Sequence, residues 1–104
     1  MWSVVAQSPA RLFLHGVHHS SAFTPPPIYR KYILPYYREF APLLHEHGIK
    51  LAMHADNDTS LILELLALAG YDMLECFVTA PMVPLTLAQA RRTLGNRVVL
   101  YGCL

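Results

Sequence analysis

The sequence has few charged residues and no long apolar run. Asp, Glu, Lys and Arg make up 14% of the 104 residues, whereas hydrophobic residues make up 54%. An average soluble domain contains roughly 25% charged residues. No uninterrupted apolar stretch approaches the roughly 18 residues that a membrane-spanning helix needs. The composition therefore predicts no membrane partner. It also predicts surfaces that are covered by more protein, so the isolated chain is expected to self-associate.

Basic stripes, export signals and cysteine pairs are also missing. The formal net charge is +1 and the Lys and Arg residues are scattered, which argues against a nucleic acid held through its phosphates. The segment 1–5 has no basic region followed by a long apolar core. Cys76 and Cys103 lack CxxC spacing. These absences favour a reduced, cytoplasmic protein without a disulfide framework.

The sequence does contain a repeated order of apolar run, polar turn, helical stretch and glycine. The apolar runs begin near Leu12, Leu51, Met73 and Val98, and the glycines that precede the last three are Gly48, Gly70 and Gly95. Because no β-hairpin signal interrupts this order, parallel strands joined by right-handed crossovers are expected. We predict an α/β fold over residues 1–104: part of a (βα)8 barrel with about four strands and three helices. A flavodoxin-like sheet is the alternative.

The first strand is expected over residues 11–15, followed by a polar loop over 16–24. Apolar and tyrosine residues then recur at helical spacing as far as His47. Pro35 and Pro42 cannot donate the helix hydrogen bond, so a kink or a two-piece helix is expected there.

Two further helices have recognisable starting residues. Asp58 or Thr59 is expected to cap the helix that ends at Gly70. Thr86 and Gln89 have the spacing of a capping box, which predicts that the last helix opens at Thr86.

The candidate site residues lie where the predicted strands end. His54 and Asp56 follow the apolar run 51–53 and share a face if the strand continues, so they are candidates for metal binding or proton transfer. Glu75 interrupts another apolar run, and a carboxylate there is costly unless it is paired. Cys76 is interpreted as a small core residue. Histidines beyond the first strand are interpreted as loop surface, although one of them could join the cluster: His15, His18 and His19.

Four segments resemble consecutive blocks of the uroporphyrinogen decarboxylase superfamily. They are FTPPPIYRKYILPYY (23–37), GIKLAMHAD (48–56), AGYDMLE (69–75) and LGNRVVLYG (94–102). The resemblance implies a (βα)8 barrel and an activity like that of the uroporphyrinogen decarboxylases or of the zinc-dependent methyltransferases that take methyl groups from corrinoids. Because such a barrel needs about 250 residues, the chain is expected to be an internal portion of one.

The segment 48–56 is similar to the methyltransferase branch, which carries His-x-Cys as zinc ligands. His54 matches the first ligand, and Asp56 replaces the cysteine with a harder oxygen ligand. The resemblance thus implies an enzyme with a small-molecule substrate, possible zinc at His54 and Asp56, and a possible corrinoid protein partner. Together with the positions described above, it makes His54, Asp56 and Glu75 the candidate catalytic residues. A non-catalytic α/β interaction module and a metal-dependent (βα)8 hydrolase are the alternatives.

Overall fold

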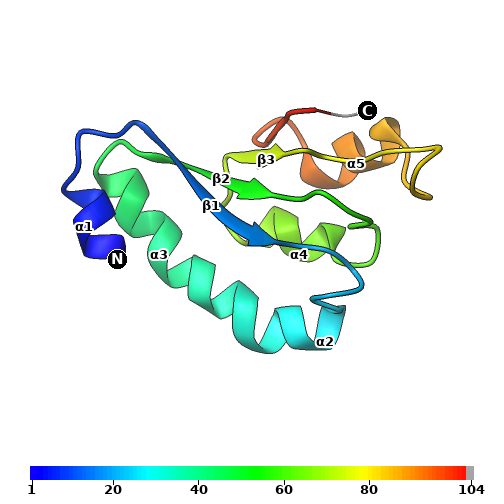
Figure 1. Ribbon diagram of the computed structural model, residues 1–104, viewed down its shortest axis with the longest axis horizontal. Coiled ribbons are helices and arrows are strands. Elements are labelled where there is room, and N and C mark those ends of the chain that lie inside the picture. The colour runs from blue at the N-terminus through cyan, green and yellow to red at the C-terminus, as the bar shows by residue number, and fades with distance from the viewer. Residues whose placement is uncertain (103–104) are drawn as a thin grey trace.

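The computed structural model describes residues 1–102, so Cys103 lies outside the described residues. Its centre is a sheet of four strands in the order β1-β2-β3-β4, and every neighbouring pair is parallel. The strands are β1 (Leu12–His18), β2 (Lys50–His54), β3 (Met73–Glu75) and β4 (Val99–Leu100). Figure 1 shows β1, β2 and β3 side by side. The predicted parallel α/β arrangement is confirmed, and it supplies half the strands of an eight-stranded barrel.

The crossovers between the strands are helical. They contain α3 (Leu34–Glu46), α4 (Leu63–Leu68) and α5 (Leu87–Leu94); shorter elements are α1 (Trp2–Ala6), α2 (Pro26–Ile28) and the π-helix η1 (Tyr29–Ile33). The hydrophobic core lies between these helices and one face of the sheet, where Leu51, Met53 and Leu74 are fully buried. Among residues 1–102, no helix combines the length and apolar character needed to cross a bilayer.

The other face of the sheet is apolar but uncovered. Leu12, Leu14 and Val99 keep 51%, 47% and 57% of their surface exposed. In a closed barrel this face would point inward and be filled by side chains from the remaining strands. Part of the excess of hydrophobic residues in the sequence therefore lies on a sheet face that these four strands leave uncovered.

Two of the predicted boundaries were wrong. β1 continues past residue 15 to His18, so the expected loop 16–24 begins later. The helix that was expected to open at Asp58 or Thr59 begins at Leu63. The turn before this helix is held by Ser21, a residue far away in the sequence. The Ser21 N–H donates to the Asp58 carbonyl (2.7 Å), and the Leu61 N–H donates to the Ser21 hydroxyl (3.1 Å).

Other local predictions were confirmed. The long helical pattern is divided near Pro35, where the Leu34 N–H donates to the Tyr29 carbonyl and so closes a π-helical turn. Pro42, in contrast, lies inside α3. Thr86 and Gln89 form the expected capping box at the start of α5. The glycines that precede the strands lie at the amino end of the sheet and adopt positive φ: Gly48, Gly70 and Gly95.

Candidate functional site

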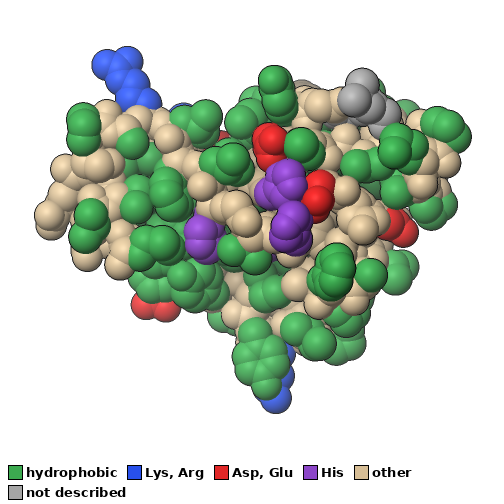
Figure 2. Space-filling view, in the orientation of Figure 1, with side chains coloured by type: hydrophobic (Ala, Val, Ile, Leu, Met, Phe, Trp, Pro, Cys, Tyr) green, Lys and Arg blue, Asp and Glu red, His purple; other side chains and the backbone are tan. Residues whose placement is uncertain are grey.

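The carboxyl ends of three neighbouring strands bring a set of polar side chains together. In the strand register, His54 at the end of β2 lies opposite Glu75 on β3 and opposite His18 on β1. An irregularity in β1 between His15 and His18 shifts the register so that His18 reaches this position. Such bulges are common beside active sites because they redirect a side chain. Figure 2 shows histidine and acidic side chains gathered at one place on this face of the molecule.

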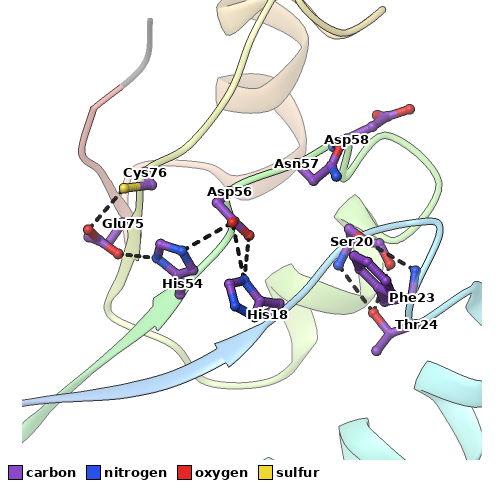
Figure 3. Close-up of polar contacts among 10 residues, drawn as sticks. All are labelled: His18, Ser20, Phe23, Thr24, His54, Asp56, Asn57, Asp58, Glu75 and Cys76. Carbon is purple, nitrogen blue, oxygen red and sulfur yellow. Dashed lines mark hydrogen bonds and ion pairs between the residues drawn. The ribbon is translucent and has the colours of Figure 1, made fainter.

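His54 occupies the middle of this cluster. Its Nδ1 lies 2.5 Å from Glu75 Oε2, and its Nε2 lies 3.2 Å from Asp56 Oδ2. β2 ends at His54, so Asp56 lies beyond the strand and not on its face, but its carboxylate still reaches the imidazole; Figure 3 shows the ring between the two carboxylates. The hydrogen bond with Glu75 raises the pKa of His54 above its ordinary value; partial burial opposes this shift and the negative charge of Asp56 adds to it.

Asp56 joins His54 to a second histidine. The Nδ1 of His18 lies 3.0 and 3.1 Å from the two oxygens of the Asp56 carboxylate. This hydrogen bond is the main reason that the pKa of Asp56 is lowered, and the charge of His54 lowers it further. The two imidazole rings are 5.0 Å apart between centroids. Because 63% of the His18 side chain is exposed, a ligand can reach this side of the cluster from solvent.

Glu75 joins His54 to a thiol on the other side. The Cys76 thiol donates to Glu75 Oε1 over 3.0 Å. This contact lowers the pKa of Glu75, as does the hydrogen bond with His54, and it raises the pKa of the Cys76 thiol. Cys76 is exposed, so its interpretation as a core residue was wrong. Its backbone adopts φ 56°, a left-handed conformation that non-glycine residues seldom adopt.

Of the three histidines that follow the first predicted strand, only His18 joins the cluster. His15 points toward the helices, where its Nδ1 lies 2.7 Å from the Tyr37 hydroxyl, and burial lowers its pKa. His19 is fully buried rather than on the loop surface. Burial, followed by the charges of the other histidines, lowers the pKa of His19 to about 4. Within residues 1–102 neither of its ring nitrogens has a hydrogen-bond partner.

The donor atoms fit a metal ion in two ways. One set is His18, His54 and Asp56, and the other is His54, Glu75 and Cys76; within each set the ligand atoms lie within 4.8 Å of one another. Both sets use His54, but through opposite ring nitrogens. A histidine that binds zinc usually donates its other ring N–H to a carboxylate. The first set leaves Glu75 in that orienting role, 2.5 Å from Nδ1, whereas the second leaves Asp56 in it at the longer distance of 3.2 Å from Nε2, so the first set fits zinc better.

The comparison with protein families assigns the chain to a family. The family model described as uroporphyrinogen decarboxylase (URO-D) matches residues 16–104. The chain belongs to this family. No curated protein and no solved structure matches the chain. The matched region includes all the strand-end residues of the cluster, and the four parallel strands are consistent with part of the barrel expected for a uroporphyrinogen decarboxylase family member.

Proposed function

We propose that the chain carries part of the active site of a uroporphyrinogen decarboxylase superfamily enzyme that binds zinc through His18, His54 and Asp56 and acts on a small molecule. One observation carries this proposal. The imidazole of His54 is held by Glu75 at Nδ1, and its Nε2 faces Asp56. Zinc bound there would supply a Lewis acid with an open coordination position for substrate or water.

The protein groups each have a defined part in this proposal. Glu75 accepts the Nδ1 proton of neutral His54, fixes the tautomer and leaves the Nε2 lone pair free to bind. Asp56 contributes an ionised oxygen, since its pKa is lowered. His18 adds a second nitrogen on the exposed side. Three protein ligands leave room for one external ligand, as in catalytic rather than structural zinc sites.

The finer form of the proposal is a methyltransferase-like activity with a corrinoid protein as methyl donor. It is supported by the likeness of residues 48–56 to the methyltransferase branch, in which a histidine occupies the position of His54. The oxygen of Asp56 in place of a thiolate makes the site harder and less suited to activating a thiol. A cytoplasmic location is part of the same proposal, because an exposed thiol such as that of Cys76 persists in a reducing compartment.

A second candidate function needs no metal and is supported by the raised pKa of His54. In a decarboxylation, carbon dioxide leaves, the electron pair of the broken carbon–carbon bond stays on the substrate carbon, and a proton must be delivered to that carbon. The imidazolium of His54 is stabilised by Asp56 and Glu75 and can deliver that proton. Solvent then restores the proton to His54.

Zinc content separates these functions. Elemental analysis of the full chain after dialysis against zinc is expected to give about one ion per chain, and His54→Ala and Asp56→Ala are expected to lose it. His45→Ala is the matched control, because it breaks a similar histidine–carboxylate pair, His45 Nε2 to Asp72 Oδ2 at 2.7 Å, at the other end of the strands. Zinc retained in both site variants would contradict the metal proposal.

The non-catalytic alternative has its own test. If the chain is only an interaction module, neither zinc nor the protonation state of His54 is used. Decarboxylase, methyltransferase and hydrolase assays should then show no activity that depends on His54. A loss of activity in His54→Ala that is absent from His45→Ala would exclude the module.

A further inference from the structure

A cavity opens beside the candidate site. It has a volume of about 240 Å³ and is lined by Asp56, Cys76, Phe77, Val78, Met82 and Gly102. Two of these residues, Asp56 and Cys76, also belong to the polar cluster that surrounds His54. The remaining side chains are hydrocarbon or thioether. The cavity is therefore continuous with the candidate site, but it offers a bound molecule almost no hydrogen-bonding group beyond that shared edge.

The walls of the cavity are held in place by backbone hydrogen bonds. The Phe77 N–H donates to the Tyr101 carbonyl over 3.0 Å, and the Ala80 N–H donates to the Leu85 carbonyl over 2.7 Å. Phe77 is itself buried, whereas 72% of Met82 is exposed. The cavity thus has a fixed floor and a flexible thioether at its rim, and Met side chains adapt readily to apolar ligands.

Gly102 keeps one side of the cavity open. A Cβ atom at this position would lie 3.2 Å from the Cα of Cys76, and the φ of Gly102 is +100°. A larger residue would therefore crowd the backbone where Cys76 already holds its left-handed conformation. The close approach of Gly102 to Cys76 places the Cys76 thiol beside the apolar wall of the cavity.

The charges around the cavity do not suit an anionic group. Two carboxylates lie at or beside the shared edge, since Asp56 lines the cavity and Glu75 accepts a hydrogen bond from the Cys76 thiol. Among residues 1–102, neither carboxylate pairs with a Lys or Arg. Figure 2 shows Lys and Arg side chains only toward the margins of this face. A carboxylate moved from water into these apolar walls would find no donor to replace its hydration.

We propose that this cavity is the subsite for an uncharged alkyl or aryl group of the substrate, which places that group beside Asp56 and Cys76 and the reacting part next to His54. The inference rests on the proposed function, because the cavity opens onto the same cluster. It assigns Phe77, Val78 and Met82 a part in specificity. The substrate class is a small molecule with a compact apolar group adjoining its reactive end.

The chain offers a direct test with straight-chain alcohols as probes. Ethanol, 1-butanol and 1-hexanol are titrated into the metal-free protein, with chelator present, and the ¹³C-labelled methionine methyl signals are followed by NMR. Burying one methylene is worth about 0.8 kcal/mol, so affinity is expected to rise about fourfold per added methylene until the cavity is full. Butyrate, which has the same carbon chain as 1-butanol, is expected to bind at least tenfold more weakly.

Met82 and Met73 give a comparison within one spectrum. The methyl signal of Met82 is expected to shift saturably as alcohol is added. The methyl signal of Met73 is expected to stay in place, because Met73 lies in a separate surface hollow that Lys50, Asp72 and Arg97 also line. Val78→Thr replaces a methyl in the cavity by a hydroxyl with little change in size and should weaken binding of 1-butanol several-fold. Val99→Thr makes the same change in the other hollow and should leave the affinity unchanged.

The proposal is overturned if the Met82 signal shows no saturable shift, if affinity is independent of chain length, or if butyrate binds as well as 1-butanol. These measurements need no zinc and no turnover. Absence of alcohol binding in a chain that takes up zinc normally would therefore refute the subsite alone, whereas alcohol binding by a chain that takes up no zinc after dialysis against zinc would refute the metal proposal alone.

Discussion

Replacing Glu75 by Gln tests which of the two ligand sets holds zinc. In the set formed by His18, His54 and Asp56, Glu75 is not a ligand and acts through its 2.5 Å contact with His54 Nδ1. Loss of such an orienting carboxylate typically costs 10–100-fold in metal affinity, which corresponds to about 1.4–2.7 kcal/mol. The prediction is that Glu75→Gln raises the Kd for zinc by this amount but does not abolish binding.

Competition with a chromophoric zinc chelator at fixed pH measures this change. Asp56→Ala removes a direct ligand and is expected to weaken binding further than Glu75→Gln does. Cys76→Ser should have little effect, because the thiol lies on the opposite side of the His54 ring. Asp72→Asn serves as the control, since Asp72 accepts the hydrogen bond of His45 far from the site. If Cys76→Ser weakens zinc binding more than Glu75→Gln, the second ligand set is in use and the reasoning is refuted.

Three further predictions concern protonation, packing and assembly. In the metal-free protein, NMR titration should place the pKa of His54 above its ordinary value of 6.5. The contribution of protonated His54 to folding stability is then complete below pH 6.5 and is lost as pH rises through the folded-state pKa. A pKa at or below 6.5 would contradict the hydrogen-bonded cluster. Tyr29→Phe leaves the buried Tyr71 hydroxyl without its 2.6 Å partner and should cost about 1–3 kcal/mol in urea unfolding, whereas adding Tyr71→Phe should recover part of that loss; additive costs would disprove the coupling. Because Leu12 and Val99 leave an apolar sheet face exposed, light scattering is expected to show self-association of the chain, and a monodisperse monomer at micromolar concentration would count against it.

Local sequence signals predicted the sheet well because they depend on neighbouring residues. The apolar runs and the glycines before them specify where parallel strands begin, and the capping box of Thr86 and Gln89 is contained within four residues. The conformation of the turn at Asp58, in contrast, depends on a residue far away in the sequence. Its backbone is bonded to Ser21, which lies far away in the sequence, so this tertiary contact outweighed the capping preference of Asp58 and Thr59.

The candidate site was predictable where position along a strand decides it. His54 and Glu75 lie at the ends of predicted strands, and the parallel register brings them together; Asp56, two residues further along, contacts His54 from beyond the strand. Which of the histidines near the end of the first strand joins them depends on the bulge before His18. No local sequence pattern predicts this bulge or the register shift that it causes. The exposure of Cys76 was missed because it depends on a left-handed backbone conformation, which sequence reasoning expects at glycine and not at cysteine.

The contacts of His54 link five ionisable groups in one continuous series. It runs from Cys76 through Glu75, His54 and Asp56 to His18, with each member bonded to the next. The hydrogen bond with Glu75 raises the pKa of His54 and the hydrogen bond with His18 lowers the pKa of Asp56, so both ends of the series act on the two groups at its centre. Removal of the His54 ring would therefore divide the series into two separate pairs, Glu75 with Cys76 and Asp56 with His18.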